Sequence, residues 1–270
     1  MSSPIAVTIA GSDSGGGAGI EADLKTFSAL GVYGAAVVTA LTAQNTNGVF
    51  GVHDVPADFI AAQTDAVFTD LDIAAVKIGM LGTAGAIDVV AAALDRYRPR
   101  NVVLDPVMVA TSGECLLRGD AAGHLRALVA RVRVITPNLP EAAALLDVPQ
   151  ARDEDEMRAQ AESLLKLGPG AVLMKGGHLN DKLGGGSASV DLLVEAGACM
   201  RLTAPRVATK NTHGTGCTLS SAVAAGLAKG LSLERAARAA KDYVSAAIAA
   251  ADHLKVGSGR GPLHHFYAWW

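Results

Sequence analysis

One repeating unit constrains the fold of this chain more than any other feature: a short apolar run, a polar segment, and then a helical pattern. The apolar runs are nearly continuous, which is typical of strands buried on both faces of a parallel sheet. The strands predicted in this way are residues 5–10, 35–41, 74–78, 102–104, 133–135 and 171–174, with a weak edge strand at 49–55. Strands that alternate with helices predict an α/β fold, in which a mostly parallel sheet carries helices on both faces.

The C-terminal part departs from this unit. Residues 180–189 are polar and rich in glycine, which favours a mobile loop. Residues 190–194 and 200–203 are expected to pair as a hairpin, and a long alanine-rich helix is predicted over 233–254. The tail, 257–270, ends in aromatic residues, and we interpret it as a packed cap or a subunit contact.

Composition narrows the possible functions. Half of the 270 residues are hydrophobic, enough for a sizeable core in one large domain or two small ones. A net charge of −3 gives no electrostatic footprint for nucleic acid. No apolar run approaches the length of a membrane span, and the N-terminus lacks the pattern of a secretory signal. Three cysteines without metal-like spacing fit a reducing compartment, so we expect a cytoplasmic protein.

Polar or flexible residues lie at the carboxyl ends of the predicted strands. In open α/β sheets, ligands bind beyond the carboxyl ends of the strands. The residues at these ends are Gly11, Gln44, Met80, Asp105, Asn138 and Lys175. We therefore expect a binding site along this edge of the sheet.

The segment 210–222 predicts a glycine-rich loop that leads into a helix. The backbone N–H groups of Gly214, Thr215, Gly216 and Cys217 should then lie unpaired at the helix N-terminus. Such a terminus carries partial positive charge and is a ready site for an anion, most often phosphate. The alternative is a loop that merely starts a packed helix. The density of titratable groups around it favours the anion site.

Three side chains of this segment would add to the chemistry. Lys210 and His213 stand just ahead of the helix and would contribute positive charge to a phosphate site. Cys217 falls in the first turn, where a helix dipole lowers the pKa of a thiol. A thiolate there could accept the proton that a hydroxyl nucleophile loses on attack.

The glycine-rich loop 11–19 follows the first strand and precedes a helix. A dinucleotide-binding fingerprint needs a small residue where Ile20 stands, and the Gly-Lys-Ser/Thr of a phosphate-binding P-loop does not occur here. The loop is therefore a binding loop of another kind or a structural turn. Asp23 follows in the early helix, and on the residues alone it is best explained as an acid that favours the helix dipole.

Five residues at or near strand ends have two interpretations each. Asn138 and Glu141 form the pattern of a capping box, or they organise Mg²⁺ near phosphates. Asp105 forms a turn, or it joins Glu141 as the carboxylate pair of a metal–nucleotide site. Lys175 is an exposed lysine or a point charge on phosphate. Gln44 is a solvated loop residue, or its amide pairs with the edge of an amino-azine ring.

Taken together, these motifs resemble the bacterial hydroxymethylpyrimidine/phosphomethylpyrimidine kinases of thiamine biosynthesis. The stretches that carry the resemblance are 11–20, 24–27, 44–46, 77–81, 136–142, 174–178 and 211–220. The resemblance implies a ribokinase-like fold with a single domain over 1–270, a homodimer, and no nucleic-acid or membrane partner. It also implies two successive MgATP-dependent transfers, which convert 4-amino-5-hydroxymethyl-2-methylpyrimidine to its monophosphate and then to its pyrophosphate.

Site residues follow from the same resemblance. The implied substrate pocket is Gln44, which contacts the pyrimidine edge, with Gly11, Asp23, Thr42, Met80 and Val107. The implied metal and phosphate positions are Asp105, Asn138 and Glu141, and the implied anion hole is Gly214 to Cys217. Thr42 stands where the family has an aliphatic residue, and Cys217 stands where most of the wider superfamily has aspartate. Two alternatives are a pyridoxal kinase-like enzyme on the same fold and a catalytically silent ligand-binding or regulatory protein.

Overall fold

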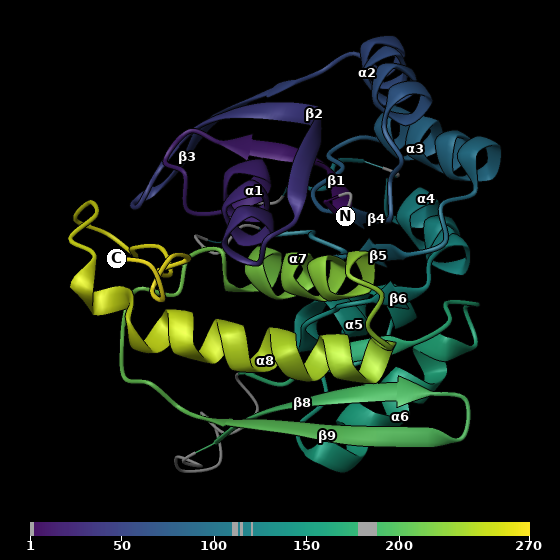
Figure 1. Cartoon of the computed structure of the whole chain (residues 1–270). Helices are drawn as coiled ribbons and strands as arrows, with labels where there is room; N and C mark the ends of the chain where they lie inside the picture. Colours follow the sequence, from purple (N-terminus) through teal and green to yellow (C-terminus); the bar gives the residue numbers. More distant parts are fainter. Residues whose placement is uncertain (1–2, 110–112, 114–115, 120, 178–187) are drawn as a thin grey trace.

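The computed structural model describes residues 3–109, 113, 116–119, 121–177 and 188–270. Within these residues, nine strands form one sheet in the order β3-β2-β1-β4-β5-β6-β7-β8-β9 (Figure 1). The strands are β1 (Ile5–Asp13), β2 (Tyr33–Asn45), β3 (Gly48–Asp54), β4 (Ala75–Ile78), β5 (Val102–Leu104), β6 (Val134–Ile135), β7 (Val172–Lys175), β8 (Ala188–Glu195) and β9 (Ala198–Pro205). Strands β2, β1, β4, β5, β6 and β7 are parallel, and β3, β8 and β9 add antiparallel edges. The predicted α/β fold is confirmed.

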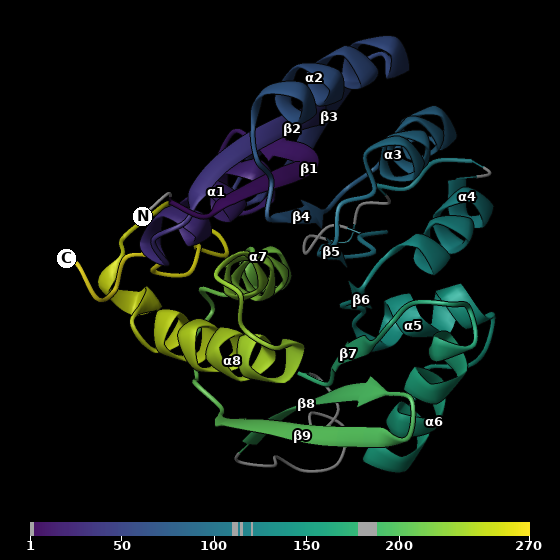
Figure 2. The ribbon, with the colours of Figure 1, turned by 45° about the vertical axis from the view of Figure 1, so that its right-hand side comes forward.

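Helices cover both faces of this sheet. They are α1 (Gly19–Ala29), α2 (Ala57–Asp70), α3 (Ala84–Tyr97), α4 (Ala121–Leu128), α5 (Leu139–Leu146), α6 (Glu154–Leu165), α7 (Thr215–Ala228) and α8 (Leu233–Ala249). Figure 2 shows α1, α7 and α8 on one face and α3 to α6 on the other. Side chains alternate along a strand, so Val7 and Ile9 of β1 pack in one core cluster while Ala6 packs in the other. Both faces are therefore apolar, which explains the continuous apolar runs.

Two strands run further than the sequence pattern predicts. Strand β1 continues to Asp13 because it pairs with β2 beyond a register shift at Ala10/Gly11. Strand β2 continues to Asn45 because its last residues pair with the antiparallel strand β3. Gln44 consequently lies on β2, opposite Val49 of the edge strand β3, and is half-buried. The interpretation of Gln44 as a solvated loop residue is therefore wrong.

The C-terminal elements largely follow the prediction. The hairpin is confirmed as β8 and β9, and the predicted edge strand is β3. The helix predicted over 233–254 ends at Ala249, and a short 3₁₀ turn follows at Ala251–His253. Most of the loop predicted at 180–189 lies outside the described residues. Within the part of the chain that the structure describes, no helix has both the length and the apolar character needed to cross a membrane.

The aromatic tail packs on α7 and α8 along part of its length. His264 and His265 are buried, the Tyr243 hydroxyl donates to the His265 carbonyl at 2.8 Å, and Thr218 Oγ1 lies 3.0 Å from His265 Nε2. The prediction of a packed cap is confirmed for this segment. Trp269 and Trp270 are instead exposed, at 71% and 73%, and the subunit contact stays a prediction.

Candidate active site

A lysine and two carboxylates meet at the carboxyl edge of the sheet. Asp105 follows β5, Lys175 is the last residue of β7, and Glu141 lies in the first turn of α5. Lys175 Nζ is 2.7 Å from Asp105 Oδ1 and 3.8 Å from Glu141 Oε2. The Thr136 hydroxyl donates to the same Asp105 oxygen at 3.0 Å. Asp105 and Lys175, two of the predicted strand-end residues, are thus brought together with Glu141, and Lys175 lies between the two acids.

The N-terminus of α7 contacts this cluster. Gly214 is its N-cap with a φ of +81°, a conformation that favours glycine. A Cβ added at Gly216 would lie 3.1 Å from Lys175 Nζ and 3.5 Å from Asp105 Oδ2. The first i to i−4 hydrogen bond of the helix runs from the Thr218 amide to the Gly214 carbonyl, at 2.9 Å. The amides of Gly216 and Cys217 therefore precede the helical ladder, as predicted.

One amide of the predicted anion loop is already used. The Thr215 N–H donates to the Thr212 carbonyl at 3.3 Å, and the Thr215 hydroxyl donates to the same oxygen at 2.7 Å. The expectation that the Thr215 amide is unpaired is therefore wrong. The donors that remain for an anion lie nearer Lys175, at Gly216 and Cys217.

Burial and mutual charge together set the protonation of this cluster. Although burial acts in the opposite direction, the nearby Asp105 and Glu141 carboxylates raise the pKa of Lys175 above its usual range. Burial works to raise the pKa of Asp105, but Lys175 and Lys77 hold it below its usual value. Burial raises the pKa of Glu141 to about 7, against the opposing effect of Lys175. The charge of the cluster thus depends on whether Glu141 holds a proton near neutral pH.

Asn138 and Glu141 form a complete capping box. Asn138 Oδ1 accepts from the Glu141 amide at 2.8 Å, and Glu141 Oε2 accepts from the Asn138 amide at 2.7 Å. The capping interpretation is therefore confirmed. It does not remove Glu141 from the site, because the same Oε2 faces Lys175. The Asn138 oxygen, by contrast, is occupied by the cap.

The oxygen atoms of this cluster suit a divalent cation. Among the residues described, no three His, Cys, Asp or Glu side chains converge into an all-protein metal cage. Mg²⁺ does not need such a cage, since it is usually held by one or two carboxylates, waters and substrate phosphates. Asp105 and Glu141 supply two carboxylates beside the N-terminus of α7, and the Lys175 ammonium already occupies a cation position between them. The residues present fit Mg²⁺ bound together with a polyphosphate.

The pKa of the Cys217 thiol is shifted in the direction opposite to the one expected at a helix N-terminus. The pKa of this thiol is raised to about 11, mainly because burial disfavours the thiolate and also because Asp23 and Asp105 repel it. Lys77 acts in the opposite direction. The expectation of a low thiol pKa is therefore wrong for the protein without ligands. The thiol is protonated at neutral pH.

A buried ion pair, Asp23 with Lys77, lies beneath the site. Lys77 Nζ is 2.9 and 2.7 Å from the two Asp23 oxygens, which also accept from Thr8 and Ser221. Both charged side chains are fully buried. The interpretation of Asp23 as an acid of the helix dipole is wrong, because its partner is a lysine of β4. In this structure Asp23 supports the floor of the site rather than an open pocket.

The remaining predicted pocket residues lie at neighbouring strand ends. A Cβ at Gly11 would lie 3.1 Å from the Met80 sulfur, so these two residues are adjacent. Val107 is half-buried, and its amide donates to the Asp105 carbonyl at 2.8 Å. The Thr42 hydroxyl lies 2.9 Å from the Ser12 carbonyl oxygen and 3.2 Å from Gln44 Oε1.

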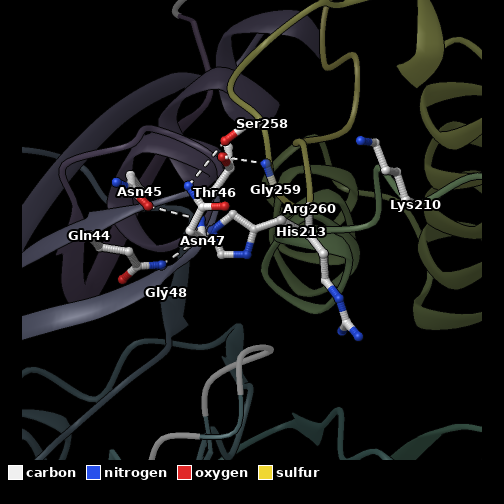
Figure 3. Close-up of a pocket in the computed structure, with 10 residues that line it drawn as sticks. All are labelled: Gln44, Asn45, Thr46, Asn47, Gly48, Lys210, His213, Ser258, Gly259 and Arg260. Atoms are coloured by element: carbon white, nitrogen blue, oxygen red, sulfur yellow. Dashed lines mark hydrogen bonds between the residues drawn. The ribbon is translucent and has the colours of Figure 1, made fainter.

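A cavity of about 450 Å³ opens beside Gln44 and His213 (Figure 3). Its lining residues are Gln44, Asn45, Thr46, Asn47, Gly48, Lys210, His213, Ser258, Gly259 and Arg260. Lys210 is exposed here, and His213 is bound to Asp13 with an Nε2 to Oδ2 distance of 2.8 Å. The structure therefore places both residues with Gln44 rather than with Lys175.

The open parallel sheet and the helix terminus that meets a lysine and two acids define a class, the ribokinase-like small-molecule kinases. The sequence profile of the phosphomethylpyrimidine kinase family matches residues 13–264. The chain belongs to this family.

Individual relatives agree with this assignment. A hydroxymethylpyrimidine/phosphomethylpyrimidine kinase of Rhizobium meliloti is 57% identical, over 98% of each chain. The crystal structure of a phosphomethylpyrimidine kinase of Clostridium difficile is 43% identical, with a TM-score of 0.79 over 90% of this chain and 99% of that one. A pyridoxal kinase of Staphylococcus aureus, in complex with AMP-PCP and pyridoxal, has a TM-score of 0.89 at 30% identity, over 99% of this chain and 95% of that one.

Proposed function

We propose that this chain transfers the γ-phosphoryl group of ATP to 4-amino-5-hydroxymethyl-2-methylpyrimidine and then to the monophosphate formed, in thiamine biosynthesis. The observation that carries the proposal is the 57% identity over 98% of each chain to a kinase named for both steps. The contact of Lys175 and Asp105 with the α7 terminus supports it, because phosphoryl transfer depends chiefly on positioning and charge stabilisation.

In this proposal each part of the site has one task. Asp105 and Glu141 hold Mg²⁺ on the nucleotide, and Asn138 orients Glu141 through the cap. Gly214, Gly216 and Cys217 present the α7 terminus to the transferred phosphoryl group, while Lys175 and Lys210 attract phosphates. Gln44 contacts the amino-pyrimidine edge, and Gly11, Thr42, Met80 and Val107 shape the pocket above Asp23. We further propose a single domain that acts as a cytoplasmic homodimer.

The test is an ATP-consumption assay with purified protein, Mg²⁺ and one ring compound at a time. We expect turnover with the hydroxymethylpyrimidine and with its monophosphate, and weaker turnover with pyridoxal. Pyridoxal is included because the fold matches a pyridoxal kinase with a TM-score of 0.89. Faster turnover with pyridoxal than with the pyrimidine would show that the proposed substrate is wrong. No turnover with any ring compound would favour a catalytically silent binding protein.

Gln44→Ala should weaken the pyrimidine far more than ATP. A bidentate amide contact with a ring edge is worth roughly 1–3 kcal/mol, so KM for the pyrimidine should rise about fivefold to 150-fold while KM for ATP stays near wild type. The measurement is steady-state kinetics with each substrate varied in turn. A pyrimidine KM within about twofold of wild type would show that Gln44 does not contact the ring.

Cys217→Ala should keep kcat within about tenfold of wild type. With a thiol pKa of about 11, fewer than about one molecule in 10³ carries the thiolate at pH 7.5. The wild-type pH–rate profile should therefore show no limb from this thiol between about pH 6 and 9. Cys217→Asp is the comparison: an acidic limb in the wild type that moves to lower pH in this variant would support a base role instead.

A further inference from the structure

The side-chain amide of Gln44 lies between two hydrogen-bonding neighbours. Gln44 Nε2 is 3.2 Å from His213 Nε2, a contact seen in Figure 3, and Gln44 Oε1 is 3.2 Å from the Thr42 hydroxyl. The oxygen and nitrogen of an amide are nearly indistinguishable in shape, so the hydrogen-bond network assigns them. The other partners of His213 and Thr42 therefore decide which way this amide faces.

His213 must offer a proton to Asp13. Asp13 Oδ2 is 2.8 Å from His213 Nε2, and the Asp13 carboxylate also accepts from the amides of Gly15, Gly17 and Ala18. Although burial acts to raise it, the pKa of Asp13 is lowered by the His213 contact and these amides, so it is an ionised acceptor. His213 Nε2 then carries a hydrogen. The Gln44 atom that faces this N–H must be an acceptor, because two donors repel.

Thr42 imposes the same orientation from the other side. Its hydroxyl has one hydrogen, and its oxygen lies 2.9 Å from the carbonyl oxygen of Ser12, which can only accept. That hydrogen is therefore used by Ser12, and the hydroxyl has only lone pairs to offer Gln44. The Gln44 atom near Thr42 must be the NH₂ group. Turning the Gln44 amide by about 180°, which exchanges its oxygen and nitrogen, satisfies both the His213 and the Thr42 contact.

We propose that Thr42 and His213 are positioning residues that hold the Gln44 amide with its oxygen toward His213 and its nitrogen toward Thr42. This proposal rests on the proposed function, because it assumes that the Gln44 amide faces the pyrimidine ring. The fixed amide presents its remaining N–H and its remaining oxygen lone pair to the ring in one defined arrangement. That arrangement matches a ring nitrogen beside an exocyclic amino group. A pyridine ring that carries a hydroxyl or aldehyde there offers no such pair, so in this chain the fixed amide favours an amino-pyrimidine.

The kinetic test replaces the hydroxyl by a methyl group of the same size. Thr42→Val should raise KM for the hydroxymethylpyrimidine about fivefold, the effect of one neutral hydrogen bond, with kcat and KM for ATP unchanged within about twofold. The ratio of kcat/KM for the pyrimidine over that for pyridoxal should fall by the same factor. Thr42→Ser keeps the hydroxyl and should restore both values. Thr203→Val is the matched control, because Thr203 is exposed on β9 at the opposite edge of the sheet.

The structural test needs no substrate and no variant. A long-range ¹H–¹⁵N NMR spectrum of the His213 ring should show hydrogen on Nε2, and an unprotonated Nε2 would overturn the proposal. Unchanged pyrimidine KM in Thr42→Val, with an active wild type, overturns the role of Thr42 and leaves the proposed function intact. If the wild type is inactive with the pyrimidine but His213 carries hydrogen on Nε2, the proposed substrate is wrong and the proposed orientation of the Gln44 amide is retained.

Discussion

Replacing Lys175 by methionine should lower kcat by about 10²–10³-fold, the usual cost of removing one donor that stabilises charge in a transition state. Lys175 Nζ lies beside Gly216 at the α7 terminus and 2.7 Å from Asp105. In the proposed function its ammonium stabilises charge on the transferred phosphoryl group. KM for the pyrimidine should change little, because the proposed contact of Gln44 with the ring lies elsewhere. Steady-state kinetics at saturating MgATP measure both values.

The same substitution should also destabilise the fold, and the two effects can be separated. Removing Lys175 leaves the buried Asp105 without its closest cation, and breaking a buried pair in this way costs about 3–5 kcal/mol. The double variant Lys175→Met/Asp105→Asn removes the unpaired charge, so urea unfolding should return toward wild type while activity does not. Lys166→Met is the matched control, since Lys166 is an exposed lysine at the end of α6. A Lys175→Met variant as active as Lys166→Met would exclude a role in catalysis.

The strand-end residues could be predicted because the fold itself brings them together. The carboxyl ends of parallel strands meet at one edge, so Asp105 and Lys175 were expected to lie close although 70 residues separate them. The capping box was also predictable, since Asn138 and Glu141 are three residues apart and cap geometry is local. A capping box is predictable because it depends only on residues that are neighbours in the sequence.

Burial and long-range pairing could not be predicted in the same way. Lys77 lies within the otherwise apolar strand Ala75–Ile78, and its partner Asp23 lies 54 residues away on α1. Only the packing of α1 against β1 and α7, with α7 on β4, brings that pair together. Cys217 shows the same limit, because sequence places it in a first helical turn but does not reveal the desolvation that raises its pKa to about 11. A lone lysine inside a buried strand was the one available signal of a buried acid.

Gly214→Ala should reduce kcat/KM by at least about 100-fold, because a misplacement of about 1 Å at a reacting centre has an effect of this size. Gly214 caps α7 with a φ of +81°, and an added Cβ would overlap the carbonyl oxygen of Gly17. The loop that contains Gly17 and the helix terminus would have to separate. That movement displaces the amides of Gly216 and Cys217 from the phosphoryl position and also disturbs Asp13 and His213.

Gly197→Ala separates this close approach from backbone strain. Gly197 has nearly the same φ, +80°, in the β8–β9 turn, and a Cβ there would meet nothing within 4 Å. Both variants should lose roughly 1 kcal/mol or more of stability from alanine at positive φ, measured by urea unfolding. Only Gly214→Ala should lose activity, and it should also lose the stabilisation that MgATP gives the wild type against thermal unfolding. If the two variants keep equal kcat/KM, the fit of Gly214 against Gly17 does not position the anion-binding amides, and strain alone explains the choice of glycine.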